Sequence, residues 1–140
     1  MATSPIDTVN AYFEAFAAHD LDRAISCFAP DADWMIPGDA ALTPWAGHRT
    51  GPQQIRQSLT AFFGRVEPVQ FEPQPLIEVG DQVLAQAAYV SRFQPSGQAL
   101  SSEVIMRFTV IDGLIAAYRV FEDSLGITRT ACGEPLTTTA

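Results

Sequence analysis

The sequence predicts an α+β fold, a cone in which three N-terminal helices pack on a curved, mainly antiparallel sheet. Helical periodicity dominates residues 4–64, and strand patterns separated by turn signals dominate residues 82–124. Helices first and antiparallel strands last are typical of this class. A strongly twisted sheet covered by helices leaves a cone-shaped space between the layers. The 140 residues predict one domain, 1–140, with a core over about residues 4–125 and a C-terminal tail over 126–140.

The three helices are predicted from their apolar spacing and their start and stop signals. The first begins at Ser4-Pro5, where Ser is a good N-cap and Pro is tolerated at the first helical position. Asp20 can cap a second helix over residues 21–29, which Pro30 ends. A third helix begins near Pro52 and ends at Gly64. Each has an apolar stripe at helical spacing, as in Ile6, Val9, Phe13 and Phe16 of the first.

Three segments outside these helices and the central strands are less regular. Residues 31–37 indicate a short strand, with Trp34 in the core or in a pocket wall. Residues 38–51 predict a long loop carrying Trp45 and His48, and such loops are often lids or binding loops. Residues 66–79 contain three prolines, which predicts an edge strand that cannot pair along its whole length.

The centre of the fold is a three-stranded meander over residues 82–124. Asp112-Gly113 is a strong signal for a two-residue type I′ hairpin turn. If Ile111 opposes Leu114, an ideal ladder places three pairs on one sheet face: Phe108 with Ala117, Met106 with Arg119, and Val104 with Phe121. Asp123 then shares that face. The earlier turn, with Pro95 opposite Gln98, adds Tyr89 opposite Val104; a one-residue slip there would exchange the faces.

This predicted face is mostly apolar and is the candidate lining of a pocket. Its polar groups are Tyr89, Arg119 and Asp123. An ionised carboxylate on an apolar surface is costly unless it is paired or functional. The alternative is that Asp123, near a strand end, contacts water or caps the next turn. The opposite face is mixed in character and suits either a partner sheet or solvent: Gln86, Arg92, Glu103, Arg107, Tyr118, Val120 and Glu122.

Composition argues against several classes of function. The formal charge is −8, all eight basic residues are arginine, and no basic run exists, so a nucleic-acid partner is not expected. No apolar run approaches the ~20 residues that a membrane-spanning helix needs, and the N-terminus lacks the pattern of a secretory signal. Two lone cysteines and two isolated histidines predict no metal site, and we expect no cofactor. We expect a cytoplasmic protein with reduced thiols.

Three blocks carry a resemblance to a known family: YFEAFAAHDLDRAISCFAPDADWMIPG, WAGHRTGPQQIRQSL and FTVIDGLIAAYRVFEDS. The chain up to about Leu125 resembles the SnoaL-like, ketosteroid-isomerase-related branch of the nuclear-transport-factor-2-like superfamily. The matching positions are Trp34, Gly47, Gly51, Asp112, Gly113, Ile115 and Asp123. The resemblance implies a cavity between helices and sheet, and a homodimer through the outer sheet face.

The resemblance also implies what the chemistry of such a cavity is. Enzymes of this kind isomerise ketosteroids, close polyketide rings or hydrate epoxides, using a buried carboxylate and a donor for the developing oxyanion. Asp123 matches the last-strand carboxylate. Met106 stands where several relatives have His, and Tyr12 and Asp33 match the steroid-isomerase pattern only approximately, which argues against a steroid substrate.

The resulting hypothesis is an enzyme of the isomerase, cyclase or epoxide-hydrolase type that acts on a neutral, apolar small molecule. Asp123 is the predicted general base, or orients a water molecule, while Tyr89 and Arg119 donate hydrogen bonds to a carbonyl or epoxide oxygen. The competing hypothesis is a non-catalytic ligand-binding or dimerisation module. The predicted pocket residues are Tyr12, Phe16, Trp34, Trp45, His48, Met106, Phe108 and Phe121.

Overall fold

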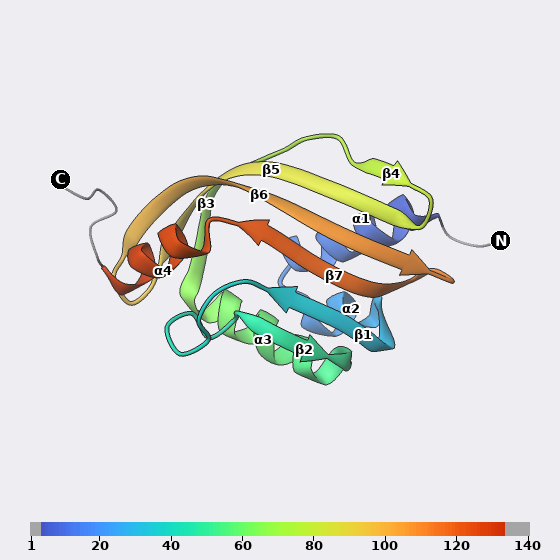
Figure 1. Cartoon of the computed structure of the whole chain (residues 1–140), viewed down its shortest axis with the longest axis horizontal. Coiled ribbons are helices and arrows are strands. Elements are labelled where there is room, and N and C mark those ends of the chain that lie inside the picture. The colour runs from blue at the N-terminus through green and yellow to red at the C-terminus, as the bar shows by residue number, and fades with distance from the viewer. Residues whose placement is uncertain (1–3, 134–140) are drawn as a thin grey trace.

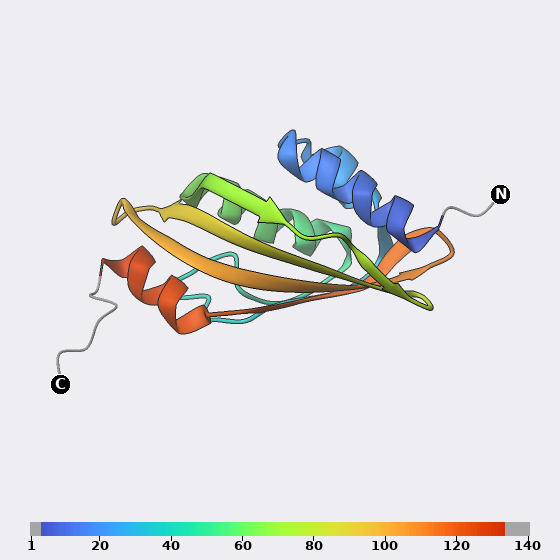
Figure 2. The same ribbon diagram turned by 90° about the horizontal axis from the view of Figure 1, so that it is seen from above.

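The structure, a computed structural model, describes residues 4–133 and confirms the predicted α+β class (Figure 1). The sheet is curved, and helices α1, α2 and α3 lie together on one side of it (Figure 2). The elements in chain order are α1 Pro5–Ala17, α2 Leu21–Ser26, β1 Phe28–Ile36, β2 Gly47–Thr50, α3 Gly51–Arg65, β3 Val66–Pro73, β4 Ile77–Val79, β5 Gln82–Phe93, β6 Gln98–Ile111, β7 Leu114–Glu122 and α4 Ser124–Cys132.

The strands follow the order β2-β1-β7-β6-β5-β3. The short strand β4 pairs with the first residues of β5, and β3 pairs with the later residues of β5. All pairs are antiparallel except β1 with β7, which run parallel. The prolines of β3 stand at the sheet edge, as predicted, because an edge strand can do without some backbone donors.

The first two helices begin where the sequence predicts. Ser4 Oγ accepts a hydrogen bond from the Asp7 N–H at 3.2 Å, and Asp20 accepts one from Arg23 at 3.1 Å. The predicted extent of α2 is wrong, because the helix ends at Ser26 and Phe28 begins β1. The Cys27 carbonyl instead accepts a hydrogen bond from the Ile115 N–H at 2.8 Å. Pairing with β7 therefore overrides the helical pattern of this segment.

The segment predicted as a long loop contains the short strand β2. Met35 of β1 pairs with His48 of β2, and Asp33 pairs with Thr50. Four residues are too few for a recognisable period in the sequence, so this strand was not predicted. Trp45 and Ala46, just before it, are buried in the core.

The β6–β7 hairpin has the predicted turn but not the predicted register. Asp112 and Gly113 have φ values of 53° and 77°, as a type I′ turn requires, and Ile111 opposes Leu114. Val110 then pairs with Ile115 and Thr109 with Ala117, so Ala116 is an extra residue, a β-bulge.

The bulge exchanges the two faces of β7, and the predicted face of this strand is wrong. Phe108 opposes Tyr118 instead of Ala117, and Val104 opposes Glu122 instead of Phe121. Glu122 therefore faces inward. Arg119 and Phe121 face outward and are exposed.

The β5–β6 register differs from the predicted one by two residues, because the turn spans Gln94 to Gly97 and Phe93 opposes Gln98. Tyr89 opposes Ser102 rather than Val104. A shift of two residues keeps every side chain on its face, so Tyr89 stays on the inner face as predicted.

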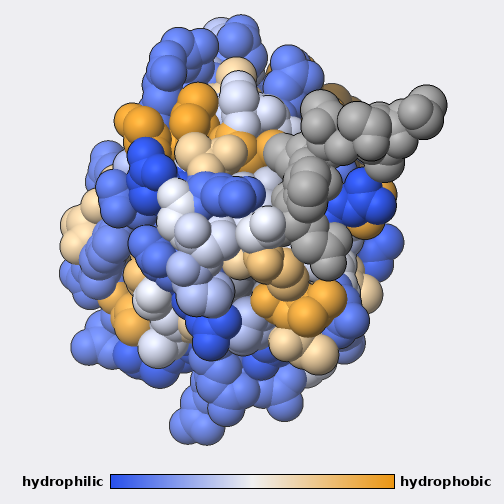
Figure 3. Space-filling model, turned by 90° about the vertical axis from the view of Figure 1, so that its left-hand side faces the viewer, coloured by the Kyte–Doolittle hydropathy of each residue, from blue (hydrophilic) through white to orange (hydrophobic). Residues whose placement is uncertain are grey.

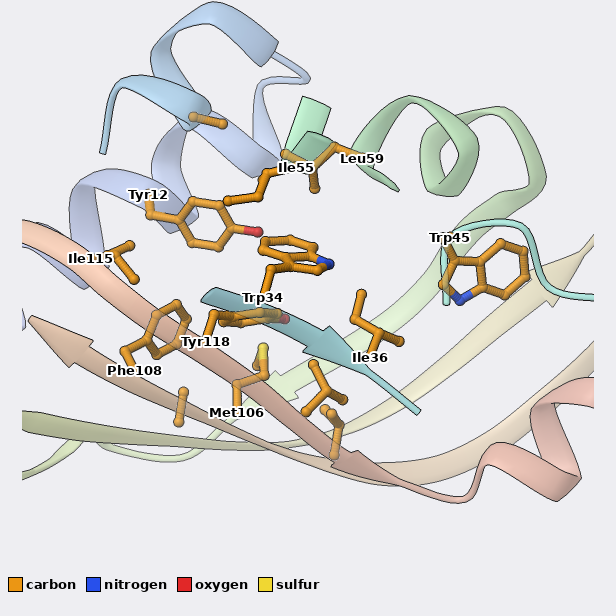
Figure 4. Close-up of a cluster of buried hydrophobic side chains, with 14 of the residues drawn as sticks. Tyr12, Trp34, Ile36, Trp45, Ile55, Leu59, Met106, Phe108, Ile115 and Tyr118 are labelled. Atoms are coloured by element: carbon orange, nitrogen blue, oxygen red, sulfur yellow. The ribbon is translucent and has the colours of Figure 1, made fainter. Parts of the chain in front are cut away.

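An aromatic cluster fills the narrow part of the cone, where α1 approaches β1, β6 and β7 (Figure 4). The rings of Trp34 and Tyr118 lie 4.3 Å apart, and those of Phe108 and Tyr118 lie 5.0 Å apart. Tyr12 packs edge-on against Phe28 at 5.4 Å. Offset and edge-on pairs of this kind are favourable beyond the apolar area that they bury.

The last element, α4, lies at the end of the sheet remote from the N-terminus (Figure 1). Ser96 Oγ in the β5–β6 turn donates a hydrogen bond to the Thr130 carbonyl at 2.6 Å, which ties α4 to this turn. The sequence predicted a tail over 126–140; α4 occupies its first part, and residues 134–140 lie outside the described residues. At this end, hydrophobic side chains form small groups among hydrophilic ones (Figure 3). No helix in residues 4–133 is long and apolar enough to span a membrane.

Candidate functional site

The inner end of β7 carries a carboxyl group in a largely apolar environment. Glu122 faces inward opposite Val104. The two preceding residues of β7 on this inner face are Val120 and Tyr118. Burial raises the pKa of the Glu122 carboxyl to about 7, and the negative charge of Asp123 adds to the rise. A carboxyl group with such a pKa exchanges its proton near neutral pH, which suits acid–base chemistry.

Two tyrosines share this region with Glu122. The pKa of Tyr89 is raised by burial and further by the charges of Glu122 and Asp123. The side chain of Ser102, which is opposite Tyr89 in the ladder, offsets part of this rise in the Tyr89 pKa. Burial also raises the pKa of Tyr118, and Tyr12 and Glu122 contribute to that rise. Both tyrosines therefore stay neutral donors at any ordinary pH.

Two buried donors of the interior have no hydrogen-bond partner among the described residues. They are the Tyr89 hydroxyl and the Trp34 indole Nε1. Figure 4 shows the Trp34 indole beside Tyr12 and over the Tyr118 ring. Native proteins leave few buried donors unpaired, because each costs free energy that a partner would recover. These groups are therefore available to hydrogen-bond a ligand or water inside the cone.

Two spaces lie along the sheet within the described residues. The larger, of about 520 Å³, lies between α1 and the β3–β4–β5 part of the sheet, and Met106 forms part of its wall. Its lining is apolar apart from Asn10, Gln74 and Gln86. Ala87 in this wall, Val104 and Glu122 form one row across β5, β6 and β7, so Ala87 and Glu122 are roughly 10 Å apart. Glu122 is not among the residues that line the larger space.

The smaller space, of about 380 Å³, lies between the ends of β1 and β7. Its lining includes Met35, Pro37, Arg119, Phe121 and also Glu122. Met35 is the last residue of β1 that pairs with β7 before the two strands separate. Of the two spaces, only this smaller hollow borders Glu122.

The three residues predicted as catalytic are not brought together. Tyr89 lies on the inner face, as predicted. Arg119 is on the outer face, where it borders the smaller hollow. Asp123 is exposed and is the N-cap of α4, where its Oδ1 accepts a hydrogen bond from the Gly126 N–H at 2.9 Å. The capping alternative for Asp123 is thus what the structure shows.

The predicted pocket residues divide into four groups. Tyr12, Trp34 and Phe108 are at most 2% exposed and fill the core rather than the wall of either space. Met106 lines the larger space. The prediction of Phe121 on the inner face is wrong, since this residue is exposed on the outer face. His48, predicted at the mouth of the pocket, is exposed on β2 and lines neither space.

The remaining two predicted pocket residues belong to an aromatic group beside α3. Phe16 is half-buried against Phe62 and Phe63, with ring distances of 5.7 and 5.0 Å. Trp45 packs against Phe62 and Phe93 at 5.9 and 6.0 Å. Neither Phe16 nor Trp45 lines either of the two spaces.

The exposed His48 contacts the carboxylate of Asp33 through its Nε2 atom, across the β1–β2 pair. This pair is isolated from the interior. In residues 4–133, no group of three or more His, Cys, Asp or Glu side chains is placed to hold a metal ion.

Glu122 is the functional candidate that the sequence interpretation missed. An ideal two-residue hairpin assigns it to the outer face, and one extra residue in the strand reverses that assignment. The sequence has no local pattern that marks this extra residue, so it held no signal for the inward direction of Glu122.

Comparison with solved structures identifies several proteins with the same fold. An NTF2-like protein from Burkholderia xenovorans LB400 is 21% identical with a TM-score of 0.82, over 94% of this chain and 98% of that chain. TerC, co-crystallised with polyporic acid, is 19% identical with a TM-score of 0.78, over 92% and 98%. An M. tuberculosis LEH-like epoxide hydrolase is 20% identical with a TM-score of 0.69, over 94% and 92%.

The search of curated proteins found no match. The model of the SnoaL-like domain family matches residues 9–118, which span α1 to the middle of β7. The resemblance noted from the sequence is therefore confirmed, and this chain belongs to the SnoaL-like family.

Proposed function

We propose that this protein acts on a neutral, largely apolar small molecule by acid–base chemistry, with Glu122 as the reacting carboxyl group. The observation that carries the proposal is the combination of a half-buried carboxyl whose pKa is raised to about 7 and an unpartnered Tyr89 hydroxyl in the same interior. A carboxyl group shifted in this way can act as a general acid or a general base near neutral pH.

The two groups take complementary roles. Protonated Glu122 donates to a carbonyl or epoxide oxygen; ionised Glu122 removes a proton from the substrate or from a water molecule. The Tyr89 hydroxyl donates to the oxygen on which negative charge develops, and a dry surrounding strengthens this hydrogen bond. Substrate approaches Glu122 from the smaller hollow, which lies on the outer side of β1 and β7 and is lined by this residue together with the outward-facing Arg119 and Phe121.

Two fold relatives support this choice of chemistry. One is an epoxide hydrolase, and another was crystallised with the small molecule polyporic acid. The sequence predicted Asp123 as the reacting carboxyl, and we assign this role to Glu122 instead. Asp123 contributes through its charge, which helps to raise the Glu122 pKa.

Turnover of small neutral epoxides and β,γ-unsaturated ketones by wild type, Glu122→Gln and Asp123→Asn tests this function. Loss of a general acid or base lowers rates on the order of 10²–10⁴-fold, and we expect this for Glu122→Gln. Asn is a good N-cap, so Asp123→Asn keeps α4 in place, and we expect it to change the rate much less. Wild-type turnover that Glu122→Gln retains in full would contradict the proposal, and so would a wild type inactive on the whole panel.

A second candidate function is ligand binding without turnover, which the larger space favours. Its volume of about 520 Å³ is that of a small-ligand site, and its polar lining consists of amides with no carboxylate. We expect the neutral fluorophore N-phenyl-1-naphthylamine to bind there. Ala85→Leu, which narrows this space, should weaken binding, and Glu122→Gln should not. Equal binding by the Ala85 variant would place the fluorophore elsewhere.

We also propose a homodimer through the outer sheet face. Ile105 and Phe121 are 41% and 45% exposed on that face, beside one another in the β6–β7 ladder. A second copy that covers these two large apolar side chains removes them from water, which favours association of the two chains. The molar mass in solution, measured by light scattering, tests this part of the proposal.

A further inference from the structure

Two arginines lie directly opposite one another on the outer side of the β6–β7 hairpin. Arg107 of β6 pairs with Arg119 of β7 in the ladder. Like charges in this arrangement are unfavourable. Neither guanidinium has a salt-bridge partner among the described residues, whereas Arg23 and Arg56 of the helices each pair with a carboxylate. The repulsion between Arg107 and Arg119 is therefore uncompensated in residues 4–133.

The carboxylates nearest to this arginine pair on the outer face are engaged or distant. Asp33 of β1 contacts His48. Asp123 accepts a hydrogen bond from the first turn of α4. Glu103 is four residues from Arg107 along β6, which corresponds to roughly 13 Å. An anion from outside the chain therefore finds the two guanidinium groups free.

The side chains around the arginine pair are apolar. Met35 of β1 stands next to Arg119 in the same row across the sheet, and Leu84 of β5 stands next to Arg107. The Arg107 guanidinium lies 5.5 Å from the centre of the Phe121 ring, a cation–π distance that favours one position for this group. The pair is thus a positive site with an apolar border.

The smaller hollow adjoins this site, because Arg119 is part of its lining. Its volume of about 380 Å³ is within the range of small-ligand sites, and Met35, Pro37 and Phe121 give it apolar walls. Glu122 also lines the hollow, and its pKa of about 7 leaves it mostly neutral at pH 6. The hollow can therefore take an apolar group next to a guanidinium.

We propose that the arginine pair and the smaller hollow together bind a small organic carboxylate with an apolar body. The ligand carboxylate accepts hydrogen bonds from Arg119 and, at the rim, from Arg107, because the planar guanidinium fork matches the two oxygens of a carboxylate. The apolar body lies in the hollow against Met35 and Phe121. Every group of this site comes from one chain, so the site does not depend on a second copy.

The site has a consequence for regulation. The proposed substrate approaches Glu122 from the same hollow, so a bound carboxylate competes with it and inhibits turnover. This consequence alone rests on the proposed function, whereas the binding itself does not.

Isothermal titration calorimetry at pH 6 tests the site with two probes of nearly the same shape, the anion 2-naphthoate and the uncharged 2-naphthamide. We expect wild type to bind 2-naphthoate on the order of 10-fold more tightly, because hydrogen bonds between two charged groups are the stronger ones. Arg119→Gln and Arg107→Gln should each reduce this preference. Both substitutions remove like-charge repulsion, so we expect both variants to fold, which circular dichroism checks.

The matched control is Arg65→Gln, which removes the same charge at an exposed position at the end of α3. We expect it to bind 2-naphthoate as wild type does. The Nε–Hε signals of arginine in ¹⁵N-labelled protein locate the site: the signals absent from the Arg107 and Arg119 variants should shift on titration, and that of Arg65 should not.

Three results would overturn the proposal: no binding of 2-naphthoate at millimolar concentration, equal affinity of wild type for both probes, or unchanged 2-naphthoate affinity in Arg119→Gln. Each of these is a measurement of binding. The carboxylate site can therefore fail while turnover that depends on Glu122 stands, and the proposed function can fail while the carboxylate site stands.

Discussion

The two faces of β7 use neighbouring residues for opposite purposes. On the inner face, Tyr118 and Val120 are buried and Glu122 is held in their apolar surroundings. On the outer face, Arg119 and Phe121 are exposed to solvent. Glu122 and Asp123 are consecutive carboxylates, yet one is desolvated and the other caps a helix in contact with water. The chemistry of a carboxylate here depends on the direction of its side chain rather than on its position in the sequence.

A single bulge sets these directions. Ala116 is the extra residue, and every side chain after it in β7 lies on the face opposite to that of an ideal hairpin. The comparison between the faces can therefore be tested by changes that affect one face at a time.

The largest expected effect comes from truncating a large side chain on each face of one strand. Phe108 on the inner face of β6 is fully buried, and Ile111 on the outer face is 50% exposed. We expect Phe108→Ala to lower the free energy of unfolding by about 3–5 kcal/mol, because it leaves a cavity among packed rings. Ile111→Ala should cost less than about 1 kcal/mol. Urea unfolding measures both, and comparable losses would contradict the assignment of the faces.

The next effect concerns the pH dependence of stability. Folding raises the pKa of Glu122 to about 7 from an ordinary value of 4.5, so between these values the folded protein holds a proton that the unfolded chain releases. Stability therefore falls as the pH rises from 4.5 through 7, by at most about 3 kcal/mol, and is level above that.

Glu122→Gln removes this titration. We expect the variant to lose stability less than wild type between pH 5 and pH 8 in urea unfolding. Parallel curves for the two proteins over this range would mean that Glu122 is not desolvated.

The smallest effect separates the capping role of Asp123 from its charge. Asp123→Ala should cost about 1 kcal/mol, because the Gly126 N–H loses its acceptor at the start of α4. Asp123→Asn should cost only a few tenths of a kcal/mol, since Asn caps equally well. Thermal unfolding by circular dichroism compares the two. Equal losses would show that the carboxylate charge matters more than the cap.

The fold was predictable where the sequence has strong local signals. Ser4-Pro5 and Asp20 mark helix starts, and Asp112-Gly113 fixes the hairpin turn, so the order of elements and the fold class follow from them. These signals depend only on residues close in the chain. The helix starts and the turn that they predict are present in the structure.

The candidate site was predictable only in part. Tyr89 was placed on the correct face because an error of two residues in register preserves the face. Glu122 was placed on the wrong face because Ala116, the bulged residue, lies in a run of two alanines without a glycine to mark it. Parallel pairing with β1, which no local pattern encodes, also begins around this part of β7. Bulges that arise from such long-range pairing leave no local trace in a single sequence.

Titration of the Glu122 carboxyl by ¹³C NMR tests the central claim most directly. Protein labelled at glutamate carboxyl carbons gives one signal for each residue, and the signal absent from Glu122→Gln identifies Glu122. The structure predicts a midpoint of about pH 7 for this group. A midpoint in the ordinary range for glutamate, near about 4.3, would place the Glu122 carboxyl in water and contradict the proposed site.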